Sequence, residues 1–144
     1  MFKINAHACI QCNPKTGFYE SIDVTAVVDE IRKHLHIVTV LETDEMLQYV
    51  NGIYIKGAEK YLSSIVVHNL RELRDWKGRP MYNNKVMNEI LSQFKYLTYV
   101  KTKEFDANID IINMKNGLYN WRTGEFFPHT PAYLSRIQIP VAYD

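Results

Sequence analysis

Residues 36–56 read HIVTVLETDEMLQYVNGIYIK and contain the clearest secondary-structure signal in the chain. Runs rich in β-branched and aromatic residues occur at 36–42, 47–50 and 53–56. Asn51-Gly52 separates the last two runs, and an Asn-Gly pair in this position indicates a tight hairpin because both residues tolerate positive φ. The stretch therefore predicts a three-stranded meander.

Apolar residues at helical spacing flank this meander on both sides. Before it, Ser21 or Asp23 can cap a helix whose apolar stripe consists of Val24, Val27, Val28, Ile31 and Leu35. After it, helices are predicted at about 58–75 and about 85–96, with Asn83 or Asn84 as the cap of the second. These two helices form a helix-turn-helix-like middle.

The last third of the chain returns to strands. A strand is expected at 99–104, and a second hairpin joins 109–114 to 118–121 through Asn116-Gly117, where the glycine is expected to supply a positive φ. The predicted fold class is α+β: a three-stranded meander and a second hairpin packed with about three helices. Residues 1–20, with a turn at 13–17, are the least patterned and stay unassigned, so the expected domain spans 21–144.

Composition narrows the classes of function. The chain has 144 residues, of which 47% are hydrophobic and 23% charged, as is typical of one globular domain. A net charge of +1 argues against nucleic-acid binding over the whole surface, so such binding would need a local patch. No apolar run approaches the roughly 20 residues that span a bilayer, and the first residues lack the apolar core of a signal peptide. We therefore expect a cytoplasmic protein without membrane association.

The segment His7-Ala8-Cys9-Ile10-Gln11-Cys12 is the first candidate for chemistry. Cys9 and Cys12 have the spacing of a zinc-binding pair, and His7 could supply a third ligand to a site that needs four. No other histidine follows Cys12 at the spacing of a zinc finger. The alternative, which the sequence favours, is a pair of reduced cysteines in a loose N-terminal segment.

The second candidate is a cluster of positive charges in the helix-turn-helix-like middle. Five cations fall within fifteen residues: Arg71, Arg74, Lys77, Arg79 and Lys85. A turn between helices can present such side chains to a phosphate backbone, which makes these five the predicted nucleic-acid-binding residues. The alternative is a solvated helix face and loop, because Glu72 and Asp75 offset part of the charge.

Motifs of the common enzyme classes are absent from the sequence. It contains no G-x-x-x-x-G-K-[ST] phosphate loop, no G-x-G-x-x-G, no G-x-S-x-G and no H-E-x-x-H. Pairs of acidic residues occur, but nothing beside them indicates a tuned acid and base. We therefore expect a fragment without an enzymatic site of its own.

Several motifs along the chain form an ordered series. The early ones are His36-Ile37-Val38-Thr39 and Tyr49-Val50-Asn51-Gly52-Ile53-Tyr54, and the late hairpin is Ile111-Ile112-Asn113-Met114-Lys115-Asn116-Gly117-Leu118-Tyr119. The closing ones are Thr123-Gly124-Glu125, Pro128-His129-Thr130-Pro131 and Pro140-Val141-Ala142-Tyr143-Asp144. In order and spacing, this series resembles the helicase-associated domain of phage, plasmid and poxvirus primase-helicases, which precedes a superfamily 3 helicase core. The resemblance covers residues 21–144.

The resemblance implies that this chain supports the other domains of a larger protein and does not itself catalyse a reaction. The chain would be a fragment of a larger primase-helicase that replicates a mobile element or virus, with the primase before it and the ATPase after it. The domain would support assembly of the helicase ring within a homo-oligomer and could contact DNA weakly, including single-stranded DNA. The family provides no catalytic residues and no cofactor to carry over to this sequence.

Two other functions stay open on the residues alone. A stand-alone DNA-binding regulator could use residues 58–96 in the manner of a winged helix, and it would then dimerise and prefer a particular duplex sequence. A small hydrolase or nuclease would need carboxylates from distant parts of the chain to converge around a metal ion.

Overall fold

The computed structural model describes residues 2–144, which divide into two compact units. Unit 1 contains the chain up to Leu35 together with Glu59–Leu97, and unit 2 contains His36–Ala58 together with Thr98–Asp144. Each unit is therefore built from two separate stretches of chain. Within the described residues, three α-helices occur with antiparallel and mixed sheets, which confirms the predicted α+β class.

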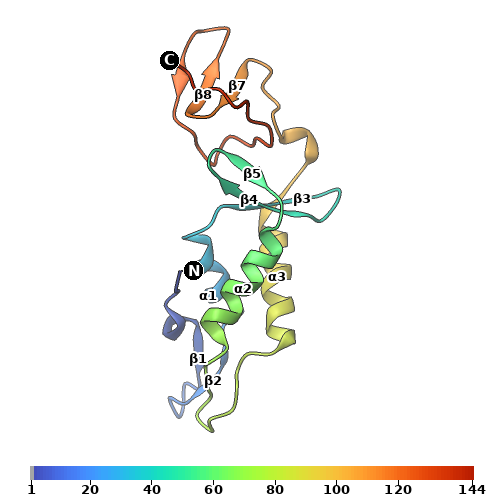
Figure 1. Cartoon of the computed structure of the whole chain (residues 1–144). Helices are drawn as coiled ribbons and strands as arrows, with labels where there is room; N and C mark the ends of the chain where they lie inside the picture. Colours follow the sequence, from blue (N-terminus) through green and yellow to red (C-terminus); the bar gives the residue numbers. More distant parts are fainter. Residues whose placement is uncertain (1) are drawn as a thin grey trace. The chain divides into compact units, whose positions relative to one another are not determined.

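Unit 1 is mainly helical (Figure 1). Its main helices are α1 (Val24–Arg32), α2 (Ala58–Leu70) and α3 (Asn84–Thr98). Its N-terminal part forms the short helix η1 (Ala6–Cys9) and the strands β1 (Ile10–Cys12) and β2 (Tyr19–Ile22). The interior of this unit is lined by apolar residues that are fully buried: Val27, Val28, Ile31, Leu62, Ile65, Val66, Leu70, Ile90 and Phe94. Removing these side chains from water is the main force that holds the unit together.

Two side-chain caps fix where helices of unit 1 begin. Asp23 accepts a hydrogen bond from the Ala26 N–H at 3.2 Å at the start of α1. Asn83 accepts one from the Val86 N–H at 3.0 Å at the start of α3. Both residues are among the predicted caps, and each satisfies a backbone donor that the first helical turn leaves without a partner.

The hairpin of β1 and β2 lies in the part of the chain that the sequence left unassigned. Ile10 pairs with Ile22 and Gln11 pairs with Ser21 in antiparallel register. The predicted turn at 13–17 closes the hairpin, since the Asn13 N–H donates to the Phe18 carbonyl at 2.9 Å. β2 runs across the domain boundary that the sequence predicts at residue 20.

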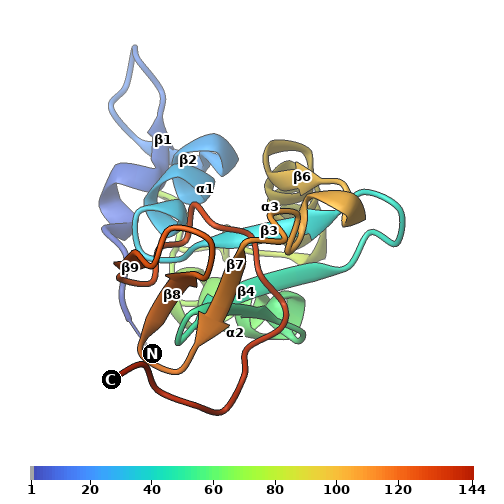
Figure 2. The same cartoon turned by 90° about the horizontal axis from the view of Figure 1, so that it is seen from above.

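Unit 2 contains the predicted meander, which is confirmed as β3 (Ile37–Val40), β4 (Met46–Val50) and β5 (Ile53–Ile55). Asn51 and Gly52 have φ values of 49° and 93°, as the tight hairpin requires. A fourth strand, β6 (Tyr99–Val100), pairs in parallel with β3, so β3 lies between β4 and β6 (Figure 2). The rest of the strand predicted at 99–104 is replaced by the short helix η2 (Thr102–Glu104).

A second sheet of unit 2 has the order β7-β8-β9, formed by Ile111–Met114, Gly117–Asn120 and Phe126–Phe127. It confirms the predicted second hairpin. The role predicted for Gly117 is wrong, because Gly117 has no positive φ. A Cβ at this position would lie 2.4 Å from the Phe127 carbonyl oxygen, so the glycine is required for close approach of β8 to β9.

A buried amide connects distant parts of unit 2. The Asn113 Nδ2 group donates to the Gly52 carbonyl at 2.8 Å and to Ser135 Oγ at 3.0 Å. Asn113 Oδ1 lies 3.0 Å from His129 Nε2 and accepts a weaker bond from Gln138 Nε2 at 3.3 Å. The late Asn113–Gly117 motif therefore has a structural role, since one side chain of the second sheet satisfies polar groups from the meander and the C-terminal stretch.

Candidate nucleic-acid interface

The connection between α2 and α3, residues 71–83, is the main feature that differs from the sequence prediction in unit 1. α2 ends at Leu70, earlier than the predicted Asp75, and a helix-turn-helix would join its helices by only ~3–4 residues. The connection instead folds back on itself, because Arg74 and Pro80 form an antiparallel bridge. The Met81 N–H donates to the Leu73 carbonyl at 3.1 Å and extends this pairing. We call residues 71–80 the basic turn.

Asp75 organises the basic turn. Its Oδ1 atom accepts the backbone N–H groups of Lys77 and Arg79, each at 2.9 Å, and its Oδ2 atom accepts the Arg79 Nε–H at 2.9 Å. These donors, with the Arg79 backbone first, hold the pKa of the Asp75 carboxyl below its usual value. The Asp75 side chain is only 9% exposed, so a carboxylate fixes a loop whose outer surface carries cations.

All five predicted cations are exposed. Four lie on the basic turn, and the fifth, Lys85, lies in the first turn of α3. Arg71 has Glu72 as an ion-pair partner at 3.4 Å, and Arg79 has Asp75 at 2.9 Å. Within residues 2–144, no carboxylate lies within ion-pair distance of Arg74, Lys77 or Lys85. These three side chains can therefore meet an external anion without giving up an internal carboxylate partner.

Exposed aromatic residues lie on the basic turn and on the β1–β2 hairpin that contacts it. Trp76 is 52% exposed, Phe18 is 47% exposed and Tyr19 is 46% exposed. The rings of Phe18 and Trp76 are stacked with centroids 5.0 Å apart, and the backbone N–H of Trp76 donates to the Tyr19 carbonyl at 3.0 Å. These contacts join the β1–β2 hairpin to the basic turn. We call Phe18, Tyr19 and Trp76 the aromatic tip.

Sequence reasoning did not identify the aromatic tip. Trp76-Lys77 is an aromatic residue next to a cation, which is a signal for nucleic-acid contact that the sequence does carry. Its partner Phe18 lies in the unassigned first 20 residues, and no local pattern connects the two. Only the pairing of the hairpin with the basic turn brings them together.

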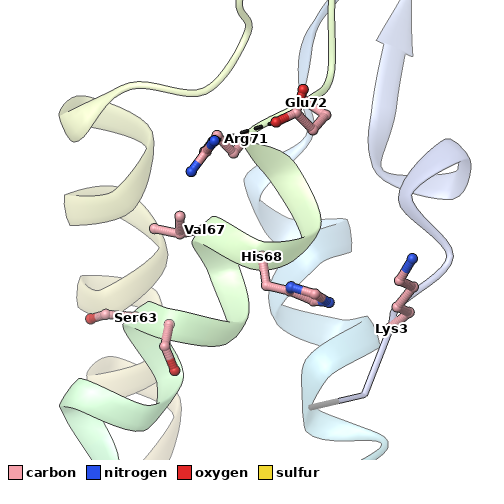
Figure 3. A pocket seen from close by; sticks show the side chains of 7 residues that line it. Lys3, Ser63, Val67, His68, Arg71 and Glu72 are labelled. Atoms are coloured by element: carbon pink, nitrogen blue, oxygen red, sulfur yellow. Dashed lines mark ion pairs between the residues drawn. The ribbon is translucent and has the colours of Figure 1, made fainter.

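A groove beside α2 extends the positive surface of unit 1 (Figure 3). It has a volume of about 730 Å³ and is lined by Lys3, Ser63, Ser64, Val67, His68, Arg71 and Glu72. Figure 3 shows Lys3 and His68 extending into the space between the N-terminal segment and α2. Asn69 holds that segment in place, since its Oδ1 accepts the Ile4 N–H at 2.9 Å. Arg71 belongs to both the groove and the basic turn.

The three predicted zinc ligands are not gathered by the structure. Cys9 is buried and its Sγ lies 3.5 Å from the Asn5 carbonyl, whereas Cys12 and His7 are exposed. Burial, aided by Glu30 and Asp23, raises the pKa of the Cys9 thiol to about 11, which disfavours the thiolate that zinc binds. Residues 10–12 form strand β1 in place of a knuckle, so the two cysteines differ in burial. Among residues 2–144, no three His, Cys, Asp or Glu side chains are grouped as metal ligands.

Formal charge is distributed unequally between the two units. The sequence of unit 1 contains eleven Lys and Arg residues against eight Asp and Glu, a net charge of +3. Unit 2 contains six against eight, a net charge of −2. The weak overall charge of +1 therefore conceals one basic unit, which carries all five predicted cations.

None of the helices within residues 2–144 has the length and apolar character needed to cross a bilayer.

Within residues 2–144, three α-helices with antiparallel and mixed sheets form a mixed α+β domain, and the five predicted cations lie on the same unit as Phe18 and Trp76. Residues 6–144 match the family model described as D5 N terminal like. The chain belongs to this family, the N-terminal domain of D5-like primase-helicases. Comparison with curated proteins gives no match.

The family match confirms the resemblance found in the sequence and links the chain to primase-helicase proteins of replication. It also begins at residue 6, whereas the resemblance begins at residue 21. The matched range therefore includes η1 and the β1–β2 hairpin, which carries two residues of the aromatic tip.

Proposed function

We propose that this chain is a non-catalytic module of a DNA primase-helicase and that unit 1 contacts DNA through the basic turn and Lys85. The observation that carries the proposal is the presence of Arg74, Lys77 and Lys85 on an exposed surface without internal carboxylate partners. Such cations bind phosphates by displacing condensed counterions, which gives weak affinity without sequence preference. Fixation of the turn by Asp75 supports binding, because the cations need not be ordered when DNA arrives.

The remaining work of the module is to support the helicase ring. The partners in this proposal are the helicase and primase domains of the same polypeptide, within a homo-oligomeric full-length protein that replicates a mobile element or virus in the cytoplasm. Unit 2 exposes large apolar side chains, among them Ile109, Ile137 and Val141. Exposed apolar groups of this size support contact with neighbouring polypeptide, since burying them there is favourable.

Replacing the cations of the basic turn tests the DNA contact. In the variant Arg74→Ala/Lys77→Ala combined with Lys85→Ala at the start of α3, we expect weaker DNA binding. The negative slope of log K against log salt should become shallower by about 2 on single strands, because each phosphate contact contributes about 0.7. Fluorescence anisotropy of a labelled oligonucleotide, measured over a range of salt concentrations, gives both quantities.

A matched control removes the same charge from unit 2. Lys56, Lys103 and Lys115 are exposed, so Lys56→Ala/Lys103→Ala/Lys115→Ala changes the net charge equally. We expect this control to keep nearly all of the affinity and salt slope of the wild type. Equal losses in the two triple variants, or no binding by the wild type, would contradict the proposed contact.

The same assay separates this module from a stand-alone regulator. A regulator of the winged-helix kind would bind one short duplex far more tightly than others, because base edges in the major groove carry the preference. The proposed module binds duplexes of different sequence with equal affinity. A strong preference for one duplex would favour the regulator.

A further inference from the structure

We infer that the aromatic tip is a stacking platform for single-stranded DNA, with the basic turn holding the phosphates on either side of the stacked base. This inference rests on the proposed function and specifies which form of DNA the surface binds. It assigns a binding role to Phe18 and Trp76, which lie outside the five predicted cations.

The geometry of the tip combines the two groups that single-strand binding requires. Phe18 and Trp76 are stacked at 5.0 Å and about half exposed, although large aromatic rings are normally buried when they serve only the core. The Lys77 Nζ atom lies 4.8 Å from the centroid of the Trp76 ring, and Arg79 is ordered by Asp75 in the same turn. Aromatic faces beside backbone-binding cations are the arrangement that binds unpaired bases without sequence preference.

A nucleobase can reach the Trp76 ring past the side chains that surround it. An exposed contact between a cation and an aromatic ring is weaker than stacking of a nucleobase on that ring. Lys77 can therefore move aside when a base arrives, and its ammonium group remains close enough to the ring to meet the adjoining phosphate. Charge and stacking then act on the same nucleotide.

Duplex DNA cannot use the tip in this way. Its bases are stacked on one another inside the helix, so their faces are not available to Phe18 or Trp76. A duplex would meet the cations of the basic turn alone. The geometry therefore predicts tighter binding of single strands, with the difference arising from the rings and not from the charges.

The two tryptophans of the chain provide the test. In the full chain carrying Trp121→Phe, Trp76 is the remaining tryptophan, and we expect titration with a short oligothymidylate to quench its fluorescence. Trp76→Leu keeps apolar bulk but removes the ring, and it should lower affinity for the oligothymidylate about tenfold. Its affinity for a mixed-sequence duplex should change by less than about twofold, because phosphate contacts dominate there.

Two further variants make the outcome decisive. Trp76→Phe retains an aromatic face and should recover much of the affinity that Trp76→Leu loses, which separates stacking from a folding defect. Trp121→Leu removes an equally exposed tryptophan that lies beside Arg122 in unit 2, and it should bind like the wild type.

The results distinguish this inference from the proposed function. If the wild type binds neither oligothymidylate nor duplex, the proposed DNA contact itself is wrong. If DNA binding depends on the basic turn but Trp76→Leu binds the single strand as tightly as the wild type, only the stacking platform is wrong. Absence of quenching at saturation leads to the same conclusion.

Discussion

Gly52 shows how one residue can be required for two reasons. Its φ is 93°, in the left-handed region that favours glycine, and a Cβ there would lie 2.6 Å from His129 Nε2. His129 cannot easily move, because its Nε2 atom also lies 2.8 Å from the Met114 carbonyl. The hairpin turn and the C-terminal stretch of unit 2 therefore depend on the absence of one methyl group.

We expect Gly52→Ala to lower the free energy of unfolding by about 3 kcal/mol, since it combines backbone strain with a steric clash. Gly57→Ala is the matched control, because Gly57 has the same φ of 93° but no atom within 4 Å of its Cβ position. Strain alone should make the control cost about 1–2 kcal/mol. Urea denaturation of both variants measures the difference. Equal losses in the free energy of unfolding would show that the close contact with His129 does not contribute to the effect of Gly52→Ala.

Sequence patterns predicted correctly which residues form the hairpin turns, but they did not always predict why a glycine is needed there. The positive φ of Asn51 and Gly52 follows from a local rule and is confirmed. At Gly117 the same rule gives the right turn and the wrong cause, because the glycine makes room for β9. The spacing of Cys9 and Cys12 fits a metal knuckle, but residues 10–12 form a strand in which Ile10 pairs with Ile22.

At the scale of elements, the basic turn depends on the ionised form of Asp75. Hydrogen bonds from Lys77 and Arg79 lower the pKa of this carboxyl from its ordinary value of 3.8. A lowered pKa means that ionised Asp75 stabilises the folded turn above pH 3.8, and that this stabilisation is lost as the pH falls through the lower, folded-state pKa.

We therefore expect the basic turn to remain ordered down to about pH 4 and to loosen below it. Trp76 fluorescence in the Trp121→Phe background reports the transition, because Trp76 follows Asp75 directly. Asp75→Asn retains an oxygen for the backbone donors and has no titrating group, so its fluorescence should lose this acid transition. A transition of unchanged midpoint in Asp75→Asn would mean that another group controls the turn.

The elements that the sequence predicted are those fixed by local chemistry. α1 has its apolar stripe and its Asp23 cap, and the meander has its Asn-Gly turn. The missed features depend on partners that are distant in sequence: the strand predicted from Tyr99 pairs in parallel with β3 through Thr39, and the β1–β2 hairpin is tied to Trp76. The strands of the β1–β2 hairpin have three and four residues, and no Asn-Gly turn like that of the meander marks them in the sequence.

At the scale of the whole molecule, each unit is assembled from two stretches of chain, and the units differ in charge. The five cations of the predicted site are recognisable from the sequence because a charge cluster needs no fold to be seen. The aromatic tip is not, because it requires residues from both stretches of unit 1. The family could likewise be predicted from the order of motifs, which the match over residues 6–144 confirms.

The central claim is that this domain binds DNA through the basic turn and aromatic tip of unit 1. The most direct test follows backbone amide chemical shifts of the full chain while a short oligothymidylate is added. We expect the largest shifts within residues 15–22 and 71–85, with unit 2 largely unchanged. Shifts confined to unit 2, or no shifts at saturating DNA, would contradict it.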